Sequence, residues 1–239
     1  MPDWADLSAQ LTAMLHPTAP PIAITFSAGL PADVDPFDEP MAPPLPDGRT
    51  GRVSAGCVFW MKAVDRTFST VAADHGNCSV GSVTHGFRRL DEVASNDDVG
   101  ALLHTGWVNA DDMPSIPAVK KQPAAITYGP LADTTADPDV VLLRLTPKSV
   151  MALHAAVPDA RFEGKPQCHI VALAKDAGEV AVSVGCALSR VRTGMAATEM
   201  TCAIPAGRVG AVVDAVTATA RADAAVAAYA ADDSSRFRT

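Results

Sequence analysis

The spacing of apolar residues predicts four helices outside the cysteine-containing segments of this chain. Apolar side chains recur at helical intervals after Trp4, and an Ala/Val-rich stretch near the C-terminus keeps its valines on one face. Thr146 followed by Pro147 marks a helix start, because threonine caps the first turn and proline suits the first helical position. The predicted helices are residues 4–15, 97–104, 147–156 and 206–230.

Short apolar runs predict four strands between these helices. They are residues 22–26, 124–128, 140–145 and 200–204. The stretch 31–52 is rich in Pro, Asp and Gly and has little periodicity, so we expect a long surface loop there. Strands and helices that mix in this way indicate an α/β (α+β) fold.

Two segments of the chain, 57–86 and 168–194, resemble two copies of one cysteine-bearing unit. After the first cysteine of each copy, Cys57 or Cys168, an alanine follows at the sixth position and an aspartate at the eighth. After the second cysteine, Cys78 or Cys186, a valine follows at the fifth position and a glycine at the eighth. The repeat suggests four thiols facing one another across a pseudo-two-fold axis.

The two copies predict two pseudo-symmetric halves that arose by internal duplication. We expect residues 1–112 to form the first half and residues 113–239 the second, together in one compact domain. An upstream echo supports this division, since PIAITF at 21–26 resembles PAAITY at 123–128. In each half the unit reads as a β-hairpin followed by a short helix.

The hairpin interpretation fixes where the cysteines lie. A turn near Ala177 places Cys168 opposite Cys186, whereas a turn near Asp65 places Cys57 opposite His75. Each second cysteine also begins a segment that ends at a glycine, which predicts a short helix starting at the cysteine. A thiolate at a helix N-terminus is stabilised by unpaired N–H groups.

Three interpretations of the four cysteines remain open. They bind an iron–sulfur cluster or a metal, with Cys57, Cys78, Cys168 and Cys186 as ligands. Alternatively they carry out thiol redox or nucleophilic chemistry through Cys78 or Cys186, or they are core residues only. Zinc, haem or no cofactor are the alternatives to a cluster, and the widely spaced cysteines lack the close pairs of a zinc ribbon. The fifth cysteine, Cys202, has no counterpart and is predicted to be a core residue.

Residues that differ between the copies are the candidates for catalysis and substrate binding. His75 and His85 occur only in the first copy and are candidate proton donors, because histidine titrates near neutral pH. Arg190 and Arg192 occur only in the second copy and are candidates for binding a small anionic molecule. Structural roles for all four residues are the alternative.

Composition limits the partners of the chain. A net charge of −8 argues against nucleic acid and against an anionic membrane surface. No apolar segment reaches the roughly 18 residues of a membrane span, and the acidic N-terminal segment does not resemble a secretory signal. We therefore expect a cytoplasmic protein, where thiols stay reduced. Monomers and homo-oligomers are both compatible with this sequence.

Several motifs resemble those of an uncharacterised prokaryotic family, domain of unknown function 169. They are AGCVFWMKA around Cys57, GNCSVG around Cys78, VGCALSRVRTG around Cys186, the EM and CAIP that follow it, and PIAITF near the N-terminus. The resemblance covers nearly the whole chain, which has Leu188 and Ser189 where a glycine is expected. It implies a bacterial or archaeal cytosolic protein and no particular activity.

The sequence therefore predicts an iron–sulfur or metal-binding protein. If it is an enzyme, redox or lyase-type chemistry on a small anionic substrate is expected, which makes it an iron–sulfur-dependent oxidoreductase or lyase. A metal-free cysteine-dependent enzyme and a non-catalytic carrier of a metal or small molecule are the alternatives.

Overall fold

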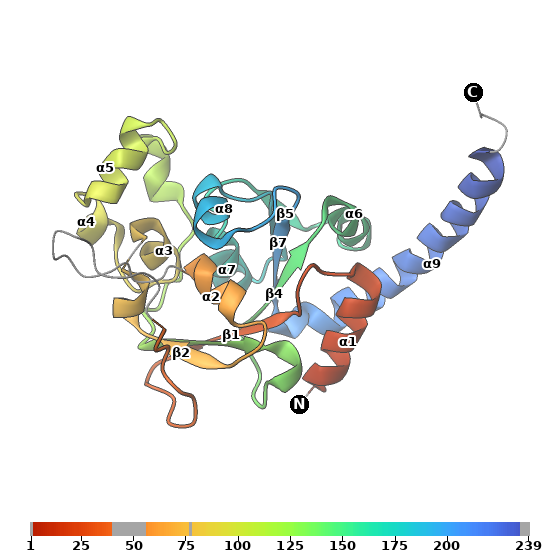
Figure 1. Cartoon of the computed structure of the whole chain (residues 1–239), viewed down its shortest axis with the longest axis horizontal. Helices are drawn as coiled ribbons and strands as arrows, with labels where there is room; N and C mark the ends of the chain where they lie inside the picture. The colour runs from red at the N-terminus through yellow and green to blue at the C-terminus, as the bar shows by residue number, and fades with distance from the viewer. Residues whose placement is uncertain (1, 40–55, 77, 235–239) are drawn as a thin grey trace.

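The computed structural model describes residues 2–39, 56–76 and 78–234, and its centre is a seven-stranded mixed sheet (Figure 1). The strand order is β2-β3-β1-β4-β7-β6-β5. Every neighbouring pair is antiparallel except β5 and β6, which run parallel. The strands are β1 (Ile22–Ser27), β2 (Phe68–Thr70), β3 (Ala125–Pro130), β4 (Val140–Leu145), β5 (Arg161–Glu163), β6 (Ala181–Ser183) and β7 (Met200–Pro205).

Helices cover both faces of this sheet. Three α-helices, α1 (Trp4–Leu15), α6 (Pro147–Ala156) and α9 (Val209–Ser234), pack on one face, and the C-terminal part of α9 extends away from the body (Figure 1). The other face carries α2 (Gly56–Lys62) and α7 (His169–Ala172), which continues as the wider π-helical turn η4 (Leu173–Ala177). The remaining α-helices are α3 (Ser79–Thr84), α4 (Leu90–Val93), α5 (Asp97–His104) and α8 (Ala187–Thr193).

The two faces of the sheet enclose two separate cores, because side chains alternate along each strand. On β4, Val141 and Leu143 face α1, α6 and α9, while Val140 and Leu142 face the layer of α2 and α7. Short 3₁₀ turns complete the connections: η1 (Ala72–His75), η2 (Ala110–Ser115), η3 (Leu131–Asp133) and η5 (Ala206–Arg208). Within the described ranges, none of the helices has the length and apolar character needed to cross a bilayer.

Most elements that periodicity predicts are confirmed. The helices at 4–15, 97–104 and 147–156 occur with these bounds, and Thr146 caps α6 through a hydrogen bond from the Ser149 N–H. The C-terminal helix begins at Val209 instead of residue 206, because the first three residues of the predicted helix form a 3₁₀ turn. The four predicted strands correspond to β1, β3, β4 and β7. The predicted loop at 31–52 lies outside the described residues from position 40 onward.

The predicted cysteine-bearing hairpins are wrong, because the first arm of each copy is helical. Cys57 lies in α2, and residues 169–177 form α7 and η4 where we expected a strand. A short apolar run that is buried on all sides does not distinguish helix from strand by its periodicity. The second arms are strands as expected, β2 and β6. Consequently Cys168 does not face Cys186 across a hairpin, and Cys57 does not pair with His75.

The short helices that start at the second cysteines are confirmed. Cys78 is the N-cap of α3 and Cys186 is the N-cap of α8. Gly86 follows the end of α3 and Gly194 ends α8, both with a positive φ angle that glycine adopts without strain. These starts bring both cysteines to helix N-termini, where backbone N–H groups are available to sulfur.

Candidate functional site: a cavity lined by four cysteines

Four of the five cysteines line one small cavity. Cys57, Cys78, Cys168 and Cys186 surround a space of about 30 Å³, together with residues of α3 and α8, of the loop that enters α7, and Trp107. Cys57 and Cys78 are partly exposed, while Cys168 and Cys186 are buried. None of the five cysteines forms a disulfide. The structure thus brings together all four residues that the sequence predicts as ligands, although by another route than hairpins.

Cross-packing of four short helices produces this convergence. Helix α2, which carries Cys57, packs on α8, whose N-cap is Cys186. Helix α7, whose N-cap is Cys168, packs on α3, whose N-cap is Cys78. Each copy of the cysteine unit therefore contacts the other, and the cavity lies where the helices meet.

Hydrogen bonds position the sulfur atoms from several sides. Gly81 donates its backbone N–H to Cys78 Sγ over 3.4 Å. The Ser189 hydroxyl accepts a hydrogen bond from Gln167 Nε2 at 2.7 Å, which leaves its own hydrogen for Cys57. The sequence did not predict Ser189 or Gln167 as residues of the site. The one signal was that Ser189 stands where the family resemblance leads one to expect a glycine. Both side chains line the cavity.

The enclosed position of the sulfur atoms favours the protonated thiol at Cys57 and Cys168. Burial raises the pKa of Cys57 to about 11, although the hydrogen bond from Ser189 and the charge of Arg192 act in the opposite direction. Burial and the neighbouring Cys78 raise the pKa of Cys168 well above its ordinary value. The neighbouring cysteines also raise the pKa values of Cys57 and Cys168, as expected for like charges that share one site.

The four thiols surround the cavity without three of them converging on one point. Among the described residues, no three His, Cys, Asp or Glu side chains are placed to share one metal ion. In a cluster each iron takes its own thiolate, so the four sulfurs need only surround the group. A cavity of about 30 Å³ admits only one or two waters.

Residues 10–215 match the family described as uncharacterised ArCR, domain of unknown function 169. The chain belongs to this family. No curated protein and no solved structure matches the chain. Membership confirms the resemblance seen in the sequence motifs and assigns no chemistry, so the function has to be argued from the cavity itself.

The two candidate arginines occupy different environments. Arg192 lines the cysteine cavity, and its charge favours the Cys57 thiolate. Arg190 donates instead to backbone carbonyls of Val184, Ala196 and Glu199. These bonds hold α8 to the segment that leaves β6 and to the segment that enters β7. Of the two arginines that the sequence predicts to bind an anion, only Arg192 lies beside the cavity.

Both candidate histidines are buried in an aromatic cluster and do not line the cysteine cavity. Their rings lie 5.4 Å apart, and His75 packs against Phe59 and Phe87. His75 bonds to Thr70 Oγ1 through Nε2 at 3.0 Å, and His85 donates Nδ1–H to the Gly81 carbonyl at 2.9 Å. Burial lowers the pKa of His85 to about 4 and that of His75 well below its ordinary value.

Cys202 is separate from the other four cysteines. It lies on β7 with its side chain fully buried in the core beneath α1, α6 and α9, on the opposite face of the sheet. Cys168 belongs to the core on the cysteine-cavity face. This placement agrees with the sequence expectation that Cys202 packs in the core.

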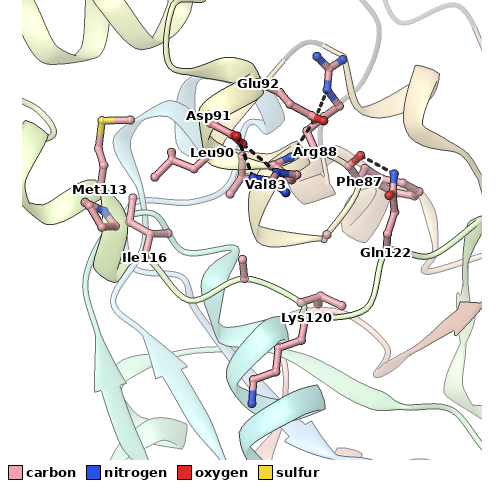
Figure 2. A pocket seen from close by; sticks show the side chains of 15 residues that line it. Val83, Phe87, Arg88, Leu90, Asp91, Glu92, Met113, Ile116, Lys120 and Gln122 are labelled. Carbon is pink, nitrogen blue, oxygen red and sulfur yellow. Dashed lines mark hydrogen bonds and ion pairs between the residues drawn. The ribbon is translucent and has the colours of Figure 1, made fainter.

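A larger open cavity of about 710 Å³ lies on the other side of α3 (Figure 2). Val83 of α3 lines it, whereas Val80 of the same helix lines the cysteine cavity. Its charged side chains pair largely with one another, through Arg88–Glu92 at 3.0 Å and Arg89–Asp91 at 2.8 Å. Figure 2 shows the Lys120 side chain directed away from these carboxylates.

Proposed function

We propose that this protein binds an iron–sulfur cluster through Cys57, Cys78, Cys168 and Cys186 and functions in redox chemistry. The observation that carries the proposal is the convergence of four thiols from four helices on one small cavity. When bound, such a cluster accepts and releases single electrons. Five free cysteines accord with a reducing compartment, which supports a cytoplasmic location.

The surrounding residues suit a group with negatively charged ligands. Arg192 places a cation at the cavity wall, and Gly81 directs a backbone N–H at Cys78. Ser189 supplies a hydroxyl to Cys57. Such donors stabilise thiolates and are typical of the outer shell of metal sites. The buried oxygen Oε1 of Gln167, without a partner among the described residues, adds a polar atom at the same wall.

Redox chemistry is favoured over lyase chemistry. An iron that acts on a substrate as a Lewis acid needs an open coordination position, as catalytic metals generally do. Four cysteines complete the ligand set of a four-iron cluster and leave no such position. A small anionic substrate would have to bind elsewhere, with Arg192 as the nearest candidate cation.

A cysteine nucleophile receives less support. A nucleophilic thiol works as the thiolate, and burial raises the pKa values of Cys57 and Cys168, which argues against these two cysteines and leaves the predicted nucleophiles Cys78 and Cys186 as the alternative. Neither His75 nor His85 lines the cavity, so no base is placed beside a sulfur there.

We also propose that internal duplication built the site. From the β1–β4 contact outward, the strand order reads β1-β3-β2 on one side and β4-β7-β6 on the other. The two-fold axis of this antiparallel pair exchanges Ile22 with Val140. Ile22 pairs with Pro130 at the end of β3, and Val140 pairs with Pro205 at the end of β7. The same axis therefore exchanges Pro130 with Pro205.

Backbone hydrogen bonds after these prolines follow the same axis. Leu131 donates to the Pro21 carbonyl at 2.9 Å, and Ala206 donates to the Asp139 carbonyl at 3.0 Å. The axis also relates the α2–α8 contact to the α7–α3 contact. The sequence echo between 21–26 and 123–128 falls instead on β1 and β3, which are neighbours in the sheet. Under this proposal the halves divide between β3 and β4.

Iron and sulfide content of anaerobically purified protein tests the proposal. We expect both elements in the wild type, with absorbance at about 400 nm. Replacing any one of the four cavity cysteines by serine should remove most of both. The control is Cys202→Ser, which changes the only cysteine away from the cavity and should retain the cluster.

Three results would overturn the cluster. They are wild-type protein that holds neither iron nor sulfide, zinc without sulfide, and full metal content in Cys78→Ser and Cys186→Ser. Circular dichroism spectra of each variant separate loss of ligands from loss of fold.

A further inference from the structure

A separate cavity of about 230 Å³ lies over β1 and β3, on the face of the sheet that also carries α1, α6 and α9. Side chains alternate along a strand, so the β1 residues that share this face with Ala23 are Thr25 and Ser27. Thr127 of β3 lies directly opposite Thr25, and Gly129 lies opposite Ala23. The floor of the cavity therefore consists of hydroxyl-bearing and small residues.

The equivalent positions in the other half of the sheet are apolar. The two-fold axis proposed above relates Thr25 to Leu143 and Thr127 to Cys202. Leu143 and Cys202 are fully buried in the core with α1, α6 and α9, whereas Thr25 and Thr127 line the cavity. Hydroxyl groups thus stand at the positions where the other half of the sheet has core residues.

The walls distinguish this cavity from a sheet face that simply meets solvent, where polar residues are also common. Two backbone segments, residues 31–34 and 133–136, line it beside the strands. The first contributes the carboxylate of Asp33 and the second that of Asp133. Among the described residues, none of the lysines, arginines and histidines lines the cavity. The charged groups of the lining are therefore all carboxylates.

We propose that this cavity binds a small amine that also carries hydroxyl groups, such as an amino sugar. An ammonium group donates charge-assisted hydrogen bonds to carboxylates, and these are stronger than neutral ones. Serine and threonine hydroxyls both donate and accept, so they can pair with hydroxyl groups of the ligand. Like charges disfavour an anionic ligand. A space of about 230 Å³ is below the roughly 300–1,000 Å³ of pockets for drug-sized ligands, which limits the ligand to about one sugar ring.

This site is independent of the proposed function. The cavity shares no lining residue with the cysteine cavity and lies on the opposite face of the sheet. Iron and sulfide content therefore reports on the cysteines alone, and binding of an amine reports on this cavity alone.

Isothermal titration calorimetry of the whole chain with glucosamine, glucose and glucuronate tests the proposal. We expect binding of glucosamine, weaker binding of glucose, which lacks the ammonium group, and no binding of glucuronate. Asp33→Asn and Asp133→Asn should each weaken glucosamine binding on the order of tenfold, the effect of one charge-assisted hydrogen bond. The matched control is Asp214→Asn, which changes an exposed aspartate on α9 and should bind as the wild type does. No heat of binding with glucosamine, or equal affinities for glucosamine and glucose, would overturn the proposal.

The floor is tested by the double variant Thr25→Val and Thr127→Val. Valine keeps the branched shape that suits a strand and removes both hydroxyl groups. We expect weaker binding of glucosamine and of glucose, with wild-type iron and sulfide content and a cooperative urea transition that shows an intact fold. Unchanged affinity of this variant for both sugars would show that the floor does not contact the ligand, and would overturn the hydroxylated ligand class.

Discussion

The buried His85 should make the protein less stable as the pH falls below neutral. In the folded protein its pKa is about 4, against an ordinary value of 6.5. Above about pH 6.5 neither state binds the proton, so this residue adds no pH dependence. Between about pH 6.5 and pH 4 the unfolded chain is protonated and the folded protein is not, so stability falls as the pH falls. The full difference amounts to about 3 kcal/mol.

Urea unfolding followed by tryptophan fluorescence measures this effect. Between about pH 7.5 and pH 5 the wild type should lose about 2 kcal/mol more unfolding free energy than His85→Gln, which has no imidazole to titrate. The exposed His154→Gln is the control for the substitution itself. His75 contributes in the same direction, because burial also lowers its pKa, so His85→Gln should retain part of the slope.

Identical pH slopes in the wild type and in His85→Gln would refute this reasoning. That outcome would mean that the folded-state pKa of His85 lies near its ordinary value of 6.5, and His85 would then return as a candidate proton donor. With the lowered pKa, both rings are neutral near pH 7 and can only accept protons there.

Two further predictions concern the packing and the reactivity of α2. A Cβ atom on Gly56 would lie 2.5 Å from Cε1 of the buried His85, so Gly56→Ala should cost about 1–3 kcal/mol in urea unfolding, whereas Gly210→Ala, with no atom nearby, should be neutral or stabilising. Equal stability of the two variants would show that the His85 ring shifts freely. In folded metal-free protein, Cys57 should react with iodoacetamide ~100-fold more slowly at about pH 7.5 than an ordinary cysteine, because burial raises its pKa from 9.0 to about 11. Mass spectrometry of the alkylated peptides measures this rate, and rapid labelling of Cys57 would favour a nucleophilic role.

The sequence predicts the outer elements well because each has a local signal. Asp97–His104 lies between Asn96 and Gly106, and α6 starts with Thr146 and Pro147, so caps and periodicity suffice for both. The segment 169–177 has no such signal. Its apolar residues are buried on every side by the sheet and by α3, and this tertiary environment is not visible from the segment alone.

The cysteine site shows why a correct ligand set can follow from an incorrect local structure. The repeat matches Cys57 with Cys168 and Cys78 with Cys186, and this match does not depend on whether each arm is a helix or a strand. Cys57 and Cys168 occupy the starts of helices that pack on α8 and α3, so they meet Cys186 and Cys78 from the opposite copy. A hairpin would have paired cysteines within one copy. Spacing reveals which residues correspond, but only packing decides which copy supplies each neighbour. Ser189 follows from that packing, because it bonds to Cys57, which is distant in sequence.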